Sequence, residues 1–286
     1  MKNERALSVA VSSDQDPLAP PTVEVELVSV GERTSAAVLR LNRPDALNAI
    51  SWEMIRELEV ALQAAEADSS VCAVLVTGRG RGFSAGGDLK SYLTLQAHPP
   101  SFDGFVRDLH RTFASIRRMS KPVVALVNGV TAAGGLELLL ACDFAYAAES
   151  ARIGDLHLNY GQIGGGGVLA LLPRAIGPAK ARELIFSARL LEAQEALSWG
   201  LVNRVVPDAE LVETGLEFAR GVAEKSPIAV SVAKDVLNRG LADGTGTDEA
   251  LRLEADATCL YAVSHPDSME GLIAFSERRK PNFPGR

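Results

Sequence analysis

The sequence has little that points to metal, redox or membrane chemistry. Its three cysteines, Cys72, Cys142 and Cys259, lie far apart and form no CxxC pair, so we expect no metal site. Cys72 and Cys142 fall in apolar runs, which is typical of core packing in a reducing, cytoplasmic compartment. No apolar run approaches the ~18 residues of a transmembrane span.

An excess of basic residues is also missing, because 29 Lys and Arg face 36 Asp and Glu for a net charge of −7. This charge disfavours nucleic acid and an anionic membrane surface as partners. Residues 1–21 end in Pro20-Pro21 and lack the apolar core of a signal sequence, so we expect a mobile N-terminal tail. What is present is a chain of 286 residues, 47% of them hydrophobic, which is enough for one large core.

Apolar runs that favour strands alternate with helical periodicities over most of the chain. Strands are expected over 23–30, 36–41, 71–77 and 123–127, and helices over 51–67, which Ser51 would cap, and 103–118. Beyond residue 209 only helices are expected, near 209–224, 227–239, 248–263 and 267–277. This order predicts an α/β core over residues 22–207 and a helical C-terminal region over 208–286.

The most informative stretch is GVTAAGGLELLLACD at residues 129–143. Gly134 and Gly135 open an apolar helix that contains a single carboxylate, Glu137. A helix start presents free N–H groups, glycine lets a ligand oxygen approach them, and burial shifts the pKa of a carboxyl group. The pattern predicts an oxyanion-binding turn with an acid or base one turn away. The structural alternative is that Glu137 caps its own helix.

A second glycine-rich turn follows the strand expected at 71–77. It reads GRGRGFSAGGDLK over residues 78–90 and contains neither G-x-x-x-x-G-K-[ST] nor G-x-G-x-x-G. A nucleotide-phosphate loop is therefore not expected. A solvated turn is the alternative to a functional role.

Both turns carry a resemblance to a known family. FSAGGDLK at 83–90 and NGVTAAGGLELLLACD at 128–143 resemble the paired signature of the crotonase superfamily, the enoyl-CoA hydratases and isomerases. Four further segments follow in the family's order, at 41–51, 171–177, 179–207 and 270–283, so the resemblance covers about residues 22–284. It implies a crotonase-like spiral of strand–strand–helix units whose helical tail forms trimers or dimers of trimers. It also implies an acyl-CoA substrate and no cofactor beyond the coenzyme A of that substrate.

The resemblance also implies site residues. The N–H groups of Ala85 and Gly134 match the oxyanion hole that binds the thioester carbonyl, and Glu137 matches the first catalytic glutamate. His157 stands where the hydratases have their second glutamate, and Gly164 replaces the usual proline. On a strand, Asp155 would share a face with His157. Further substrate contacts are expected from Gly86, Gly87, Asp88, Lys90 and Lys280, the last in a basic patch that a neighbouring subunit could use.

Hydration of an enoyl thioester needs a polarised carbonyl, a base for water and an acid for the α-carbon. We expect an enoyl-CoA hydratase that uses Glu137 and His157, whose imidazole suits proton transfer at neutral pH. A structural role for His157 is the alternative. Two other kinds of function stay open. One is another crotonase reaction that works with one carboxylate, such as double-bond isomerisation, acyl-CoA hydrolysis or C–C cleavage, and the other is an acyl-CoA-binding protein without turnover.

Overall fold

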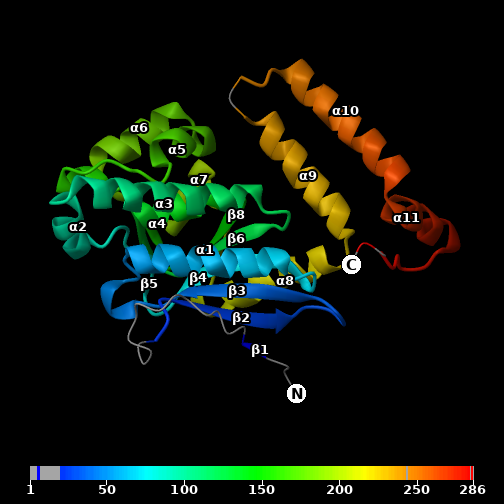
Figure 1. The fold of residues 1–286 in the computed structure, drawn as a ribbon, viewed down its shortest axis with the longest axis horizontal. Coiled ribbons are helices and arrows are strands. Elements are labelled where there is room, and N and C mark those ends of the chain that lie inside the picture. The colour runs from blue at the N-terminus through cyan, green and yellow to red at the C-terminus, as the bar shows by residue number, and fades with distance from the viewer. Residues whose placement is uncertain (1–4, 7–19, 243, 284, 286) are drawn as a thin grey trace.

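A computed structural model describes residues 5–6, 20–242, 244–283 and 285, and it contains two sheets. The larger sheet has the order β1-β2-β3-β4-β6-β8-β11 (Figure 1). Its strands are β1 (Arg5–Ala6), β2 (Val23–Ser29), β3 (Ser35–Leu41), β4 (Val71–Gly78), β6 (Val123–Val127), β8 (Phe144–Ala148) and β11 (Arg204–Val206). The strands β1, β2 and β3 pair antiparallel, and every pair from β3 to β11 is parallel.

Helices cover the larger sheet on both faces. Leu39 and Val76 point toward the core below α1 (Trp52–Ala67) and α3 (Pro99–Arg118). Val38 and Leu75, on the alternate face, pack with residues of α8 (Leu211–Ala223). A sheet buried on both faces explains why these strands read as continuous apolar runs rather than as an alternating pattern.

A smaller sheet positions the candidate site. It has the order β10-β9-β7-β5, with β5 (Gly82–Ser84), β7 (Val130–Ala132), β9 (Arg152–Gly154) and β10 (Leu190–Glu192). The β5–β7 and β7–β9 pairs are parallel, and β10 runs antiparallel to β9. The carboxyl ends of β5, β7 and β9 therefore meet at one edge, which brings together the segments that follow them.

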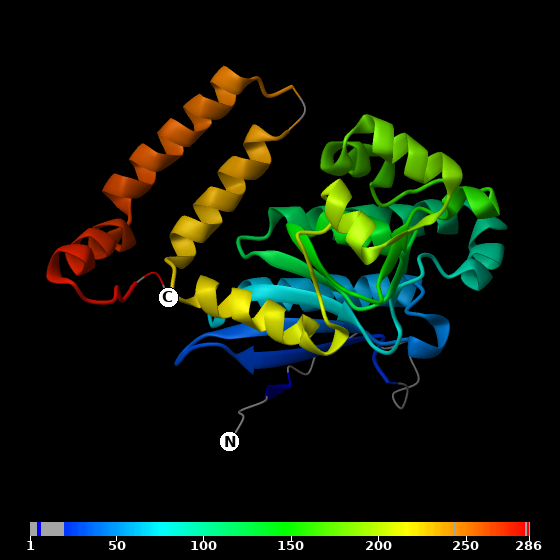
Figure 2. The ribbon, with the colours of Figure 1, turned by 180° about the vertical axis from the view of Figure 1, so that it is seen from behind.

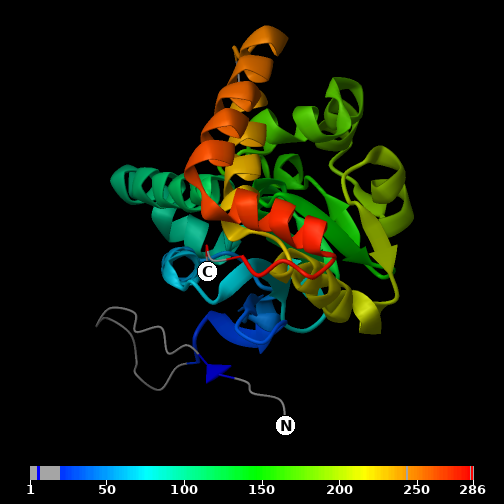
Figure 3. The same cartoon turned by 90° about the vertical axis from the view of Figure 1, so that its right-hand side faces the viewer.

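The remaining helices fall into two groups. Around the core lie α2 (Leu89–Gln96), α4 (Gly134–Ala141), α5 (Val168–Ile176), α6 (Pro178–Ser187), α7 (Ala193–Trp199) and the 3-10 turns η1 (Pro44–Ala46), η2 (His157–Tyr160) and η3 (Asp208–Glu210). The C-terminal group comprises α9 (Pro227–Gly240), α10 (Thr247–Ser264) and α11 (Pro266–Glu277). Figure 2 shows α10 and α11 projecting from the body beside α9, and in Figure 3, viewed from that side, they lie in front of the body.

One buried lysine ties the C-terminal group to the core. Lys234 of α9 donates from Nζ to the carbonyls of Ile116 and Lys121 and to Asp143 Oδ2, the last at 2.7 Å. By contrast, α10 has no buried residue in the single chain. Its apolar side chains, among them Leu260 and Val263, are exposed.

Most of the expected elements are confirmed. The expected strands are present with shifts of one residue at most, and the Ser51 hydroxyl accepts the Met54 N–H, as a cap does. The helix expected at 103–118 begins at Pro99, and β5 and α2 were not anticipated. Residues 5–6 of the expected N-terminal tail add strand β1, whereas 1–4 and 7–19 lie outside the described residues. Within the described part of the chain, no helix is long and apolar enough to span a bilayer.

Candidate active site

The turns that follow β5 and β7 pack directly against each other. Gly86 adopts φ +99°, and a methyl group built on it would lie 2.7 Å from Ala133 Cβ and 3.1 Å from Gly134 N. A side chain at this position would collide with the start of α4, and this φ favours glycine. Two glycine-rich segments that are far apart in sequence therefore form one backbone-lined corner.

The expected oxyanion donor at Ala85 is corrected by the structure. The Ala85 N–H donates to the Leu47 carbonyl at 2.9 Å, so it is already used within the protein. By contrast, the N–H groups of Gly87 and Gly134 have no hydrogen-bond partner among the described residues. A methyl group on Gly134 would lie 3.5 Å from Gly87 N, so these two groups border the same space. The free donors are thus at Gly87 and Gly134, and Gly134 agrees with the expectation from sequence.

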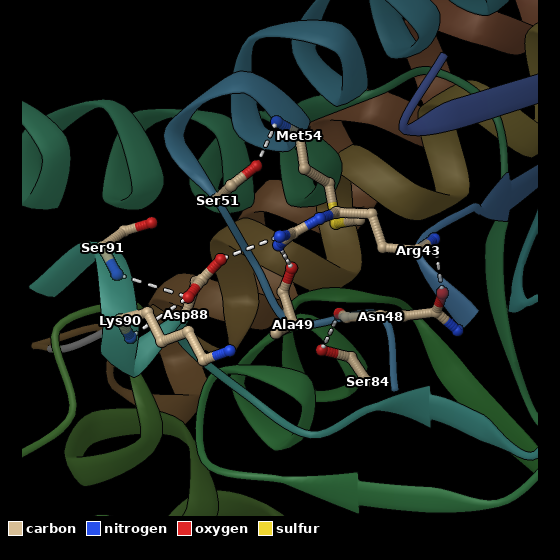
Figure 4. A network of polar contacts seen from close by, with 9 residues as sticks. All are labelled: Arg43, Asn48, Ala49, Ser51, Met54, Ser84, Asp88, Lys90 and Ser91. Atoms are coloured by element: carbon tan, nitrogen blue, oxygen red, sulfur yellow. Dashed lines mark hydrogen bonds and ion pairs between the residues drawn. The ribbon is translucent and has the colours of Figure 1, made fainter. Parts of the chain in front are cut away.

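Asp88, expected to contact substrate, instead holds the loop in place (Figure 4). Its Oδ2 accepts from Arg43 at 2.9 Å, and its Oδ1 caps α2 by accepting from the backbone of Lys90 and Ser91. Arg43 also donates to the Ala49 carbonyl at 2.6 Å. Burial opposes ionisation of Asp88, but these hydrogen bonds outweigh it and keep its pKa below the ordinary carboxyl range. Lys90 is exposed at the start of α2.

Glu137 lies in α4, a helix whose residues are all buried. Its Oε1 does not cap its own helix, as the structural alternative required, but accepts the N–H groups of Gly166, Gly167 and Val168 at 2.8, 3.1 and 3.3 Å. These donors belong to the start of α5. Burial raises the pKa of Glu137, although His157 and these N–H groups oppose the rise. Its Oε2 has no partner among the described residues.

His157 lies in the turn η2 rather than on a strand, so the expected strand relation to Asp155 is wrong. The two side chains still meet, because Asp155 Oδ1 pairs with His157 Nδ1. Asp155 is buried, with 2% of its surface exposed. Burial of the imidazole opposes its protonation, but the hydrogen bond and charge of Asp155, with the charge of Glu137, raise the pKa of His157.

Gly164 separates the two candidate acid–base groups. A methyl group built on it would lie 2.6 Å from Glu137 Oε1 and 3.3 Å from His157 Cε1. It would also lie 2.3 Å from Val168 Cγ1. The glycine therefore leaves room for a carboxylate and an imidazole on either side of it.

Helix α3 forms an apolar wall beside this glycine turn. A methyl group on Gly166 would lie 2.9 Å from Phe113 Cδ2, and one on Gly165 would lie 3.1 Å from Val106 Cγ1. The wall presents apolar side chains to the glycine turn, so it favours an apolar ligand group over a charged one.

Lys280 is not brought to the site within one chain. Its side chain is 92% exposed and makes a 3.5 Å ion pair with Glu224. The neighbouring Arg279 pairs with Glu270 and Glu277. Helix α11, which precedes Lys280, lies on the opposite side of the body from α2 (Figures 1 and 2). Contact of Lys280 with substrate stays a prediction. In the described ranges, no group of His, Cys, Asp and Glu side chains forms a metal site.

Known proteins are similar to this chain in sequence and in fold. The family profile described as enoyl-CoA hydratase/isomerase matches residues 31–286. A crotonyl-CoA hydratase of Syntrophomonas wolfei is 36% identical over 259 residues, covering 90% of this chain and 98% of its own. A mitochondrial methylglutaconyl-CoA hydratase of Mus musculus is 35% identical, covering 89% of this chain and 81% of its own. The crystal structure of an enoyl-CoA hydratase from Bacillus anthracis superposes with a TM-score of 0.85 at 33% identity, covering 93% of this chain and 100% of that one.

Proposed function

Because the chain belongs to the enoyl-CoA hydratase/isomerase family, we propose that it adds water across the double bond of a 2-enoyl-CoA thioester. The observation that carries this proposal is the convergence of two unpartnered N–H groups, at Gly87 and Gly134, beside the buried Glu137. Such a pair binds a carbonyl oxygen more tightly as negative charge develops on it, and one donor of this kind is typically worth about 10²–10³ in rate.

The two titratable groups divide the proton transfers between them. Glu137 takes a proton from water as the water oxygen bonds to the β-carbon, and the electrons of the double bond move toward the thioester oxygen. His157, whose protonated form is favoured by the hydrogen bond and charge of Asp155, then gives a proton to the α-carbon from Nε2, because Asp155 occupies Nδ1. Transfer of the proton from Glu137 back to His157 through solvent resets the site, so that the net reaction consumes one water.

The test is product analysis on crotonyl-CoA, with loss of the conjugated enoyl absorbance as the rate assay. A 3-hydroxyacyl-CoA product supports hydration. A shifted double bond or free coenzyme A would instead identify an isomerase or a hydrolase. If the protein binds the thioester and returns it unchanged, it is a binding protein without turnover.

Isomerisation is the second candidate, and one observation favours it. The position that holds a second glutamate in the hydratases holds His157, and isomerisation needs only one acid–base group. His157→Ala should abolish hydration if the imidazole is the acid, since a positioned acid contributes about 10²–10⁴ in rate. His157→Glu should restore part of the rate. A His157→Asn variant that keeps both the rate and the pH profile would favour isomerisation.

The proposal extends to the oligomeric state and the cellular location. The uncovered apolar side chains of α10 support a homotrimer or a dimer of trimers, built by the helical region 208–286 around the core of residues 22–207. The net charge and the scattered cysteines support a cytoplasmic enzyme. It would use no cofactor beyond the coenzyme A of its substrate.

A further inference from the structure

Tyr92 places its hydroxyl against Gly87, one of the two residues of the candidate site whose N–H group has no partner in the described part of the chain. A methyl group built on Gly87 would lie 2.4 Å from the Tyr92 hydroxyl oxygen and 2.6 Å from Cζ. The phenol therefore occupies the space that a side chain at position 87 would take. Its own backbone is fixed in the first turn of α2, where Tyr92 N donates to the Asp88 carbonyl at 3.0 Å.

The ring of Tyr92 is held by aromatic neighbours, whereas its hydroxyl is free. Phe102 and Phe105 of α3 meet the ring edge to face, with centroids 5.6 and 5.5 Å away. No hydrogen-bond partner for the hydroxyl exists in the described part of the chain. Burial, and then the charges of Glu137 and Asp88, raise the pKa of Tyr92 to about 12. The group is therefore a hydrogen-bond donor throughout the neutral range.

We propose that Tyr92 is a third donor of the oxyanion site, whose hydroxyl binds the thioester oxygen as it acquires enolate charge beside Gly87. This inference rests on the proposed function, since it assumes a thioester held by the Gly87 and Gly134 N–H groups. The space between these donors and Glu137 must hold the carbonyl and the α- and β-carbons. The Tyr92 hydroxyl lies against Gly87, and it is near enough to Glu137 for that carboxylate to raise its pKa. We therefore place the hydroxyl at the edge of this space, where its O–H can rotate toward the oxygen. A neutral phenol suits this role because it adds no charge in the ground state.

The variant that isolates the hydroxyl is Tyr92→Phe, which keeps the ring and its contacts with Phe102 and Phe105. We expect kcat for crotonyl-CoA to fall about tenfold to a hundredfold with KM changed less than twofold, because a donor used mainly in the transition state affects kcat. Tyr92→Leu removes the ring as well. Leu93→Ala, on the same helix with 79% of its surface exposed, is the control and should match the wild type.

A second readout does not depend on turnover. Acetoacetyl-CoA forms a stable enolate whose negative charge is shared between the ketone and the thioester oxygen, and its absorbance reports the bound enolate. Tyr92→Phe should weaken binding of this enolate tenfold or more while leaving the affinity for coenzyme A unchanged. Equal enolate binding by wild type and Tyr92→Phe would overturn the proposal, as would a loss of rate in Tyr92→Leu alone. A wild type that binds the enolate through Tyr92 but does not hydrate crotonyl-CoA would refute only the proposed hydration.

Discussion

Asp155 and His157 form a hydrogen-bonded pair, Oδ1 to Nδ1, across the turn between β9 and η2. The pairing fixes which ring nitrogen is occupied, so Nε2 is the nitrogen available to a substrate. Because Asp155 is buried and His157 is partly buried, the carboxylate acts on the imidazole with little screening by water. This pair is where the chain departs from a site built on two glutamates.

Asp155→Asn should move the pH dependence of the reaction. Asp155 raises the pKa of His157, so its removal lets burial dominate and lowers that pKa. If protonated His157 is the acid, activity is lost as the pH rises through its pKa, and this loss should occur at lower pH in the variant. We expect the rate at pH 8 to fall at least about tenfold. A pH series of kcat/KM measures the shift.

The matched control for this change is Asp45→Asn, which removes the same charge at an exposed position in η1. It should leave the profile unchanged. An Asp155→Asn profile that coincides with the wild-type profile would show that His157 is structural.

Lys234→Ala should destabilise the protein because it removes the buried cation that joins α9 to the core. The change leaves Asp143 Oδ2 and the carbonyls of Ile116 and Lys121 without this donor. Breaking a buried ion pair costs about 3–5 kcal/mol, and the partial exposure of Asp143 places the expected loss near the lower end. Urea unfolding measures it. Lys280→Ala, at a position whose side chain is 92% exposed, should change the free energy of unfolding by less than about 0.5 kcal/mol.

The order of strands and helices could be predicted from sequence because its signal is local. Buried strands such as 71–77 are apolar runs, and helix 51–67 begins with a serine that caps it. Of the elements that were missed, β5 lies inside a glycine-rich stretch where composition favours a turn, and α2 begins directly after it. Their structure comes from tertiary contacts, namely pairing with β7 and the Arg43–Asp88 ion pair.

The candidate site was predicted only in part, for a related reason. Glu137 and Gly134 were found because a carboxylate in an apolar helix and a glycine pair are visible in the letters. The sequence could not show that Gly87 rather than Ala85 is the donor. Whether an N–H group already has a hydrogen-bond partner within the protein depends on the fold. Only the structure shows that Leu47 occupies the Ala85 N–H. Likewise, only the fold brings the start of α5 to Glu137, whose Oε1 accepts the Gly166 N–H.

Gly164→Ala should impair both stability and activity. The added methyl group would lie 2.3 Å from Val168 Cγ1 and 2.6 Å from Glu137 Oε1, so the carboxylate must shift. Overpacking of this kind costs about 1–3 kcal/mol. We also expect kcat to fall at least about tenfold, because a displaced base loses its alignment with water. Thermal unfolding and the enoyl absorbance assay measure the two effects.

Gly221→Ala in α8 is the control for this change, since a methyl group there would meet no atom within 4 Å. It should stabilise the helix by roughly 0.5–1 kcal/mol and leave the rate unchanged. A Gly164→Ala enzyme with the wild-type rate would mean that Glu137 does not need its observed position.

Glu137→Gln should remove activity while retaining or improving stability. The glutamine oxygen can still accept the N–H groups of Gly166, Gly167 and Val168, so the start of α5 stays capped. Loss of the base should lower kcat at least about a hundredfold. The folded pKa of Glu137 is raised by burial, so folding favours its protonated form. Stability contributed by this group is therefore present at low pH and lost as the pH rises through the ordinary carboxyl range toward the raised value.

The variant removes this pH-dependent loss because glutamine does not ionise. Melting temperatures of the two proteins should be alike near pH 4, and near pH 8 the variant should melt at the same temperature as the wild type or above it. If the variant is less stable than the wild type by the same amount at both pH values, Glu137 acts as a cap for α5 and its negative charge does not destabilise the fold. In that case kcat decides its role, since a cap that takes no part in proton transfer would leave turnover intact. Reduced turnover with retained stability would show that the Glu137 carboxylate serves catalysis rather than folding.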